Sequence, residues 1–166
     1  MYFDSHAHYD NEQYDEDRAS LLADLPKQGV SGVLNVGYDV ASSKAAIALA
    51  ETYPYFYAAV GVHPHDVKDI NDEDLQILKE LSKHKKIVAI GEIGLDFYYD
   101  HSPRDLQRHW FKKQLALAKE MDLPVAIHSR DAAKEVFDTI VESGITKGVL
   151  HCYSGHLPIA LDYVEM

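Results

Sequence analysis

The sequence predicts an α/β fold, a (β/α)8 TIM-type barrel of which about six βα units are present. Three observations lead to this prediction. Short β-rich runs alternate with longer amphipathic stretches, and the β-rich runs are apolar along nearly their whole length, which is typical of parallel strands covered by helices. The segment after the first β-rich run, His6–Asp10, contains no glycine. An open nucleotide-binding sheet normally has a glycine-rich turn there, so a barrel fits better than an open doubly wound sheet.

Six short runs rich in valine, isoleucine, leucine and aromatic residues are predicted to form the strands. In chain order they are Tyr2–His6, Gly32–Gly37, Tyr57–Val62, Ile87–Glu92, Val125–His128 and Gly148–His151. The intervals between them are long enough for a crossover helix, as parallel pairing requires.

The intervals are predicted to form helices. They are Tyr14–Lys27, Ser42–Thr52, Asp72–Lys83, Pro103–Met121 and Ala132–Ser143, and a further helix begins near Leu157. In the third, Leu75, Leu78 and Leu81 recur at helical spacing behind Asp72, a residue type favoured at N-caps. Pro103 suits the first turn of the fourth, where its missing N–H costs no hydrogen bond.

The composition is that of one globular domain covering residues 1–166, with 46% hydrophobic and 26% charged residues. A complete (β/α)8 barrel has eight strands and typically ~250 residues. Six strands would leave two sheet edges open, which favours aggregation. We therefore expect a single domain that is incomplete at its C-terminal end.

Three features bear on location and partners. No apolar run approaches the roughly 20 residues that a membrane-spanning helix needs, and the single cysteine, Cys152, cannot form an internal disulfide. We expect a cytoplasmic protein that does not cross a membrane; the sequence leaves its oligomeric state open. The net charge of −11 argues against a broad basic surface that grips duplex DNA, and favours a strand end or a small anion.

Histidines stand at the ends of several predicted strands. His6 and His8 point to the same side of the first strand, because side chains alternate along a strand, so both can bind one metal ion. His128 and His151 end the fifth and sixth strands. A single histidine at a strand end is more often a satisfied core residue, but a set of them at the C-terminal ends of barrel strands, where barrel active sites lie, predicts a metal site.

Glu92 ends the fourth strand and shares its face with the apolar Val88 and Ile90. An unpaired carboxylate is costly to bury, and a metal ion removes that cost. The alternative is a salt-bridged acid at a strand end. Two nearby glycines, Gly91 and Gly94, indicate close backbone packing around Glu92.

Five motifs, in order, resemble the successive signatures of the TatD family of metal-dependent deoxyribonucleases, which have amidohydrolase-like barrels. They are Asp4–His8, Val60–His65, Gly91–Asp96, Pro124–Arg130 and His151–Gly155. The resemblance extends from Tyr2 to about Gly155.

The resemblance implies a dinuclear site of two divalent ions, Mg2+, Mn2+ or Zn2+. Its ligands would be His6, His8, Glu92, His128 and His151, with Glu92 bridging the ions. The implied activity is hydrolysis of phosphodiester bonds in DNA by an exonuclease acting on single-stranded ends. In this family a further aspartate at the end of the eighth strand completes the catalytic site; no position matches it, since that strand would lie beyond Met166.

Two residues are candidates for substrate binding. His63, in the loop after the third strand, can hydrogen-bond a substrate phosphate or serve as a structural loop histidine. Arg130 can bind a phosphate with its planar guanidinium or pair with Asp131. In addition, Tyr98 or Tyr99, after the fourth strand, can stack on a base.

Two alternatives stay open. An amidohydrolase or lactonase would use the same metals on a small molecule, but such relatives often carry a carboxylated lysine where Glu92 stands, and no lysine ends a strand here. A truncated barrel could also bind metal without turnover.

Overall fold

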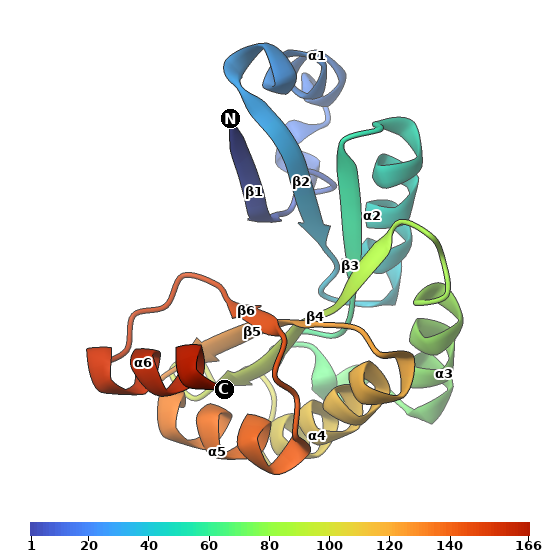
Figure 1. Cartoon of the computed structure of the whole chain (residues 1–166). Coiled ribbons are helices and arrows are strands. Elements are labelled where there is room, and N and C mark those ends of the chain that lie inside the picture. Colours follow the sequence, from blue (N-terminus) through green and yellow to red (C-terminus); the bar gives the residue numbers. More distant parts are fainter.

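Six parallel strands form one sheet in the order β1-β2-β3-β4-β5-β6 in the computed structural model, which describes residues 1–166 (Figure 1). The strands are β1 (Tyr2–Ala7), β2 (Val30–Val36), β3 (Phe56–Val60), β4 (Ile87–Asp96), β5 (Val125–Arg130) and β6 (Gly148–Leu150). Each strand pairs in parallel with the next one along the chain. The predicted alternation of strands and helices and the barrel type of fold are confirmed.

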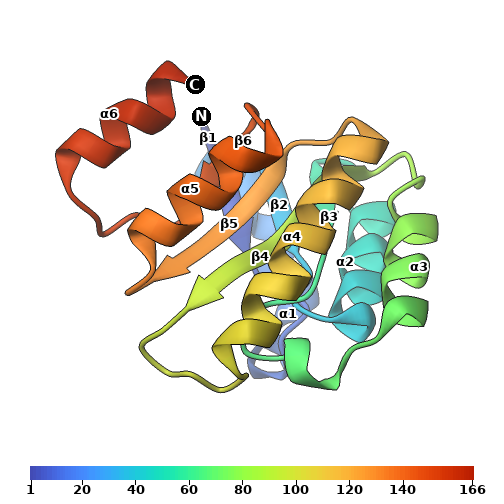
Figure 2. The ribbon, with the colours of Figure 1, turned by 90° about the horizontal axis from the view of Figure 1, so that it is seen from below.

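The helices lie along the outer side of the curved sheet, as Figures 1 and 2 show for α2 to α5. They are α1 (Arg18–Asp24), α2 (Val40–Thr52), α3 (Asp72–Leu81), α4 (Arg104–Met121), α5 (Ala133–Ser143) and α6 (Leu157–Glu165), with short 3-10 turns η1 (Glu12–Tyr14), η2 (Leu25–Gln28) and η3 (Val67–Asp69). None of them is long and apolar enough to cross a membrane.

Two apolar clusters occupy the two faces of the sheet. A cluster of 25 buried residues packs between the strands and the helices. A smaller one of five, which includes Leu34 and Ala126, lies on the inner face, because its members alternate along the strands with outer-face residues such as Val33 and Val125. The inner face of β5 continues from Ala126 to His128, so the strand carries this histidine to the inner side of the barrel.

The curvature of the sheet brings its first and last strands together at one end. β1 and β6 share no backbone hydrogen bonds. The ring of His6 in β1 nevertheless stacks on the ring of His151, directly after β6, with centroids 3.8 Å apart. The six strands therefore curl into a nearly closed barrel.

The first helix is shorter than predicted. The sequence pattern indicated a helix over Tyr14–Lys27, but α1 covers only Arg18–Asp24, between two 3-10 turns. At the C-terminal end the cause is Pro26, which has no N–H to donate to the carbonyl of Leu22. That carbonyl instead accepts a hydrogen bond from the hydroxyl of Tyr55.

The third helix, α3, is capped one residue earlier than predicted. The N-cap is Asn71 rather than Asp72; its side-chain oxygen accepts from the backbone N–H of Asp74, whose carboxylate accepts from the N–H of Asn71 in return. Asp72 is the first helical residue and pairs with Lys113 of α4. The reciprocal capping box satisfies two backbone donors, which one Asp72 cap would not.

Three strands end two or more residues away from the ends of the predicted apolar runs. β4 continues past Glu92 to Asp96, and β5 continues past His128 to Arg130, because the two extensions pair with each other. The contact depends on Gly94, whose φ is +147° and where a Cβ atom would lie 1.9 Å from the carbonyl oxygen of His128. β3 ends early, at Val60, since the N–H of Val62 donates to the side chain of Gln114 rather than to a strand.

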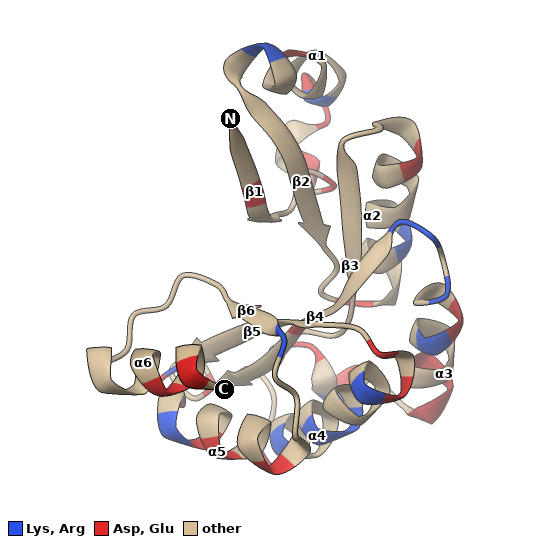
Figure 3. Cartoon of the chain, viewed as in Figure 1, with Lys and Arg blue, Asp and Glu red and all other residues tan.

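Acidic and basic side chains are interspersed over the outer helices rather than gathered by sign, as Figure 3 shows for α3, α4 and α5. Several form exposed pairs, such as Arg108 with Glu135 and Lys112 with Glu142. These three helices therefore present a surface of mixed charge.

Candidate metal centre

The C-terminal ends of the strands carry the predicted metal ligands. His6 lies in β1 and His8 directly after it, Glu92 in β4, His128 in β5, and His151 directly after β6. Because all six strands run in the same direction, these ends meet at one mouth of the barrel. The structure brings all five side chains together there.

The carboxylate of Glu92 is the centre of this group. Its Oε2 atom faces the Nε2 atoms of His6, at 3.3 Å, and His8, at 3.6 Å. Its Oε1 atom faces Nδ1 of His128, at 3.1 Å, and Nε2 of His151, at 3.4 Å. Each oxygen of one buried carboxylate therefore faces a different pair of imidazoles.

The division of the imidazoles is not absolute. The donor atoms of His6, Glu92 and His151 all lie within 4.8 Å of one another, so His151 is within reach of the Oε2 side as well. It also stacks on His6. The three-residue group suits one ion, with His8 beside it.

The electrostatics favour an ionised Glu92 carboxylate beside a neutral His151. Burial raises the pKa of Glu92, but hydrogen bonds from His128 and His6 outweigh it, so its pKa lies well below the usual range. Burial lowers the pKa of His151, and the neighbouring His6 lowers it further. His128 is the exception: its carboxylate neighbours outweigh the effect of burial and raise its pKa. A negative centre with available ring nitrogens attracts a cation.

The hydrogen bonding of His8 tests whether a metal fits. Its Nδ1 atom lies 2.8 Å from the carbonyl oxygen of Val36, which can only accept, so Nδ1 carries a proton. In the neutral form of such a ring, Nε2 is a bare lone pair. That lone pair lies 3.2 Å from Nε2 of His6 and faces Glu92. A lone pair directed at a carboxylate repels it unless a cation lies between them. A metal-bound histidine also usually donates its other ring N–H to a backbone carbonyl or carboxylate, as His8 does to Val36. The residues present fit a metal ion.

The backbone around Glu92 is unusually close to its neighbours. The N–H of Glu92 donates to the carbonyl of Gly37, after β2, at 2.6 Å. A Cβ atom at Gly91 would lie 2.6 Å from the Cβ of Ala126 in β5, and one at Gly61 would lie 2.8 Å from the backbone of Gly91. The close packing predicted from the glycines is present around Glu92.

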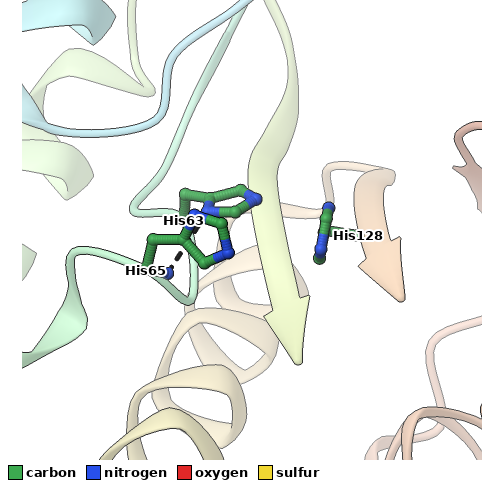
Figure 4. A group of neighbouring side chains, drawn as sticks. All are labelled: His63, His65 and His128. Carbon is green, nitrogen blue, oxygen red and sulfur yellow. Dashed lines mark hydrogen bonds between the residues drawn. The ribbon is translucent and has the colours of Figure 1, made fainter. Parts of the chain in front are cut away.

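A second group of ring nitrogens adjoins the first. His63 and His65, in the loop after β3, and His128 in β5 offer donor atoms within 4.8 Å of one another (Figure 4). The N–H of His65 donates to Nδ1 of His63 at 3.2 Å, which fixes the loop (Figure 4). His128 thus belongs to both groups.

Asp96, fully buried at the end of β4, supports this second group. Its Oδ2 atom lies 2.8 Å from Nε2 of His65 and 3.0 Å from Nε2 of His128. Burial raises the pKa of Asp96, but bonds from the backbone N–H of Tyr99 and from both histidines lower it to about 2. The sequence interpretation assigned no role to His65 or Asp96. The signal available was their position within the two motifs Val60–His65 and Gly91–Asp96.

His63 lies inside the cluster rather than at its edge. Its Nε2 atom is 3.7 Å from Oε1 of Glu92, and its ring contacts those of His65 and His128, each at 4.4 Å between centroids. Burial lowers its pKa to about 3, which keeps the ring neutral. Because Nδ1 accepts from the N–H of His65, Nε2 of the neutral ring carries the proton and can donate one hydrogen bond.

Arg130 is not part of the cluster. It lies at the end of β5, exposed, with its guanidinium over the rings of Tyr98 and Tyr99 at 4.5 and 4.8 Å. The pairing with Asp131 that the sequence left open is not formed. The other three arginines, Arg18, Arg104 and Arg108, each pair with a carboxylate.

Comparisons with known proteins agree on one family. Residues 3–166 match the family described as TatD related DNase. The chain is 42% identical, over all of its length, to the uncharacterized metal-dependent hydrolase YabD of Bacillus subtilis. It is 38% identical, over 92% of its length, to the 3'-5' ssDNA/RNA exonuclease TatD of Cronobacter sakazakii.

A solved structure shows the same fold. The crystal structure of YjjV, a TatD homologue of Escherichia coli, superposes on 99% of this chain with a TM-score of 0.92 and 32% identity. The chain spans 66% of the length of YabD, 59% of the exonuclease and 64% of YjjV. On the match over residues 3–166, the chain belongs to the TatD related DNase family.

Proposed function

We propose that the protein is a metal-dependent hydrolase that cleaves phosphodiester bonds of DNA, acting as an exonuclease on single-stranded ends. Residues 1–166 would act as one hydrolase domain. The proposal rests on family membership and on one geometric observation, the arrangement of imidazoles around Glu92. The C. sakazakii relative, named for action on both ssDNA and RNA, supports a single-stranded substrate and makes RNA a necessary comparison.

The site would hold two divalent ions, Mg2+, Mn2+ or Zn2+, with Glu92 bridging them. His6 and His8 lie on the Oε2 side of Glu92, and His128 and His151 lie on the Oε1 side. A carboxylate with separate ligands on each oxygen is what a bridging role requires. Such ions, when bound, activate water as a nucleophile and neutralise charge on phosphoryl oxygens.

The residues of the chain contribute position and proton placement. Val36 holds the His8 ring in one tautomer through Nδ1, which leaves Nε2 free to act as a ligand. Asp96 orients the ring of His128 through its contact with Nε2, which leaves Nδ1 facing Glu92. The neutral ring of His63, close to Glu92, can hydrogen-bond a substrate phosphate. The unpaired guanidinium of Arg130 can bind a phosphate further along the strand.

Metal analysis tests the site directly. Saturation with Mn2+ followed by removal of free ions should leave two ions per chain, and Glu92→Gln should leave fewer than one. Glu120→Gln, which changes an exposed acid paired with Lys79, is the matched control and should leave the number unchanged. Fewer than one ion per chain in the unaltered protein would contradict the dinuclear site.

Substrate panels test the reaction. A 5'-labelled single-stranded oligodeoxynucleotide should be shortened in a metal-dependent manner, and faster than the corresponding duplex. The rate on an RNA of the same sequence shows whether the protein distinguishes ribose from deoxyribose. Ester, lactone and amide substrates test the amidohydrolase alternative. Cleavage of these in place of the oligonucleotide would overturn the nuclease proposal, and stoichiometric metal without cleavage of any substrate would favour a non-catalytic protein.

A further inference from the structure

Beside the metal centre lies a surface of ring systems that the proposed ligand set does not use. It consists of Tyr98, Tyr99, His101 and Arg130, and is called here the aromatic shelf. Tyr98 and Tyr99 are 58% and 48% exposed, although large aromatic side chains are stabilised by burial. Tyr99 stacks on His101 at 5.4 Å between centroids with only 7° between the ring planes. Tyr99 and His101 therefore present parallel rings to solvent, and the ring of Tyr98 stands at 89° to that of Tyr99.

Arg130 gives the shelf an available positive charge. Its guanidinium lies over both tyrosine rings and takes part in no ion pair, whereas each of the other three arginines pairs with a carboxylate. Stacking of this kind aligns the planar fork and leaves its N–H groups free for an anion. Unpaired charge next to exposed rings is the combination that single-stranded nucleic acids bind.

The shelf is fixed to the metal centre through Asp96. The Oδ1 atom of Asp96 accepts from the backbone N–H groups of Tyr98, at 3.0 Å, and Tyr99, at 2.9 Å. Its Oδ2 atom contacts His65 and His128. One fully buried carboxylate thus sets the position of the tyrosine turn relative to a proposed metal ligand.

The ring of Tyr99 also approaches the cluster directly, 5.6 Å from the ring of His65 between centroids. His65 in turn lies 6.0 Å from His128. The exposed rings and the candidate metal site are therefore near neighbours with one histidine between them. These separations would bring the base of a nucleotide whose phosphate lies at the metal site close to the shelf.

We propose that the aromatic shelf stacks on the nucleobase of the nucleotide adjoining the scissile phosphate, while Arg130 binds a neighbouring phosphate. This inference rests on the proposed nuclease function and adds the residues that select unpaired bases. A base in a duplex has both faces covered by its neighbours, so the shelf engages strands with unstacked ends. Stacking does not distinguish the four bases strongly, since each has a π face, so the shelf gives single-strand preference without sequence preference.

The test of stacking uses a single-stranded oligonucleotide with 2-aminopurine at its terminal or penultimate position, with Ca2+ as the added ion. Binding to the unaltered protein should quench the fluorescence of one of the two probes. Tyr98→Ala and Tyr99→Ala should each weaken binding by about 5- to 100-fold, as expected for loss of one base–aromatic contact. Tyr98→Phe and Tyr99→Phe keep the ring and should bind normally. No quenching at either position, or quenching that survives both alanine substitutions, would overturn the proposal.

Tyr2→Ala is the matched control. Tyr2 is 72% exposed but lies at the start of β1, at the opposite end of the strands from the shelf. Its substitution should leave both binding and fluorescence unchanged. A comparable loss in this variant would indicate nonspecific binding to exposed tyrosines and would contradict the shelf.

Abasic substrates separate the shelf from the nuclease activity itself. The loss in kcat/KM caused by Tyr98→Ala and Tyr99→Ala should disappear on a strand that lacks the base next to the scissile bond. An equal loss on intact and abasic strands would mean that the tyrosines act through the fold and not through the base. If the unaltered protein quenches the probe but cleaves no strand, the shelf stands and the proposed nuclease function fails. If it cleaves the strand and the alanine variants show no loss that depends on the base, the nuclease function stands and the shelf fails.

Discussion

Nε2 of His128 lies 3.0 Å from Oδ2 of Asp96, while Nδ1 of the same ring lies 3.1 Å from Oε1 of Glu92. One imidazole thus stands between two buried carboxylates that belong to the same strand, β4. A neutral ring donates to only one of the two carboxylates, and only the ring nitrogen without the proton can bind a metal ion. With the proton on Nε2, which faces Asp96, Nδ1 would be free to bind the proposed metal ion on the Glu92 side.

Asp96→Asn should weaken metal binding by about 10- to 100-fold, the usual cost of removing the carboxylate behind a metal-bound histidine. The amide has the same shape, and its oxygen can still accept from the N–H groups of Tyr98 and Tyr99. Titration calorimetry with Mn2+ gives the affinity. Asp138→Asn, an exposed acid paired with Lys134, is the control. An unchanged affinity in Asp96→Asn would show that Asp96 only fixes the tyrosine turn.

Metal should stabilise the protein against heat. An ion that binds only the folded state adds about 2.7 kcal/mol at a concentration 100 times its Kd. Scanning calorimetry should therefore show a Tm that rises with Mn2+ and returns to its starting value with EDTA. The rise should be absent in Glu92→Gln, in which the central carboxylate is missing. A rise of equal size in that variant would place the stabilising ion elsewhere.

Gly94→Ala should be strongly destabilising. With φ at +147°, Gly94 adopts a backbone conformation that side chains rarely allow, and its Cβ would lie 1.9 Å from the carbonyl oxygen of His128. We expect a loss of at least about 2 kcal/mol in the free energy of unfolding, measured in urea. Gly144→Ala provides the comparison, because its φ is also positive, at +73°, while its Cβ would meet only a flexible lysine end at 3.4 Å. Its cost should be about 1 kcal/mol; equal losses would mean that the close approach of β4 and β5 carries no cost.

Tyr55→Phe should cost about 1 kcal/mol, because it leaves the carbonyl of Leu22 without its donor. Pro26→Ala restores a backbone N–H that can serve this carbonyl. In a double-mutant cycle, Tyr55→Phe should therefore cost less in the Pro26→Ala background than alone. Urea denaturation of the four proteins measures the coupling. Strictly additive losses would show that the hydroxyl of Tyr55 does not replace the bond lost at Pro26.

His65 and Asp96, to which the sequence assigned no role, show what strand periodicity does not reach. His6, His8, Glu92 and His128 could be singled out because strand periodicity states which side each faces. His65 lies in the loop after β3, where no periodicity applies, and so its orientation could not be derived. Asp96 lies four residues past the predicted end of β4, because the glycines in that segment lower strand propensity.

Sequence by itself determined the alternation of strands and helices, the outer and inner faces of the strands, and the histidines and glutamate at their C-terminal ends. These follow from local periodicity and residue type, which the chain carries wherever it folds. The tertiary structure alone decided the length of β4, the loss of a turn from α1, the entry of His63 and His65 into the cluster, and the link from Asp96 to both the tyrosines and His128. Each depends on a contact between residues far apart in the chain, such as Gly94 with His128 or Tyr55 with Leu22, and no local pattern encodes such contacts.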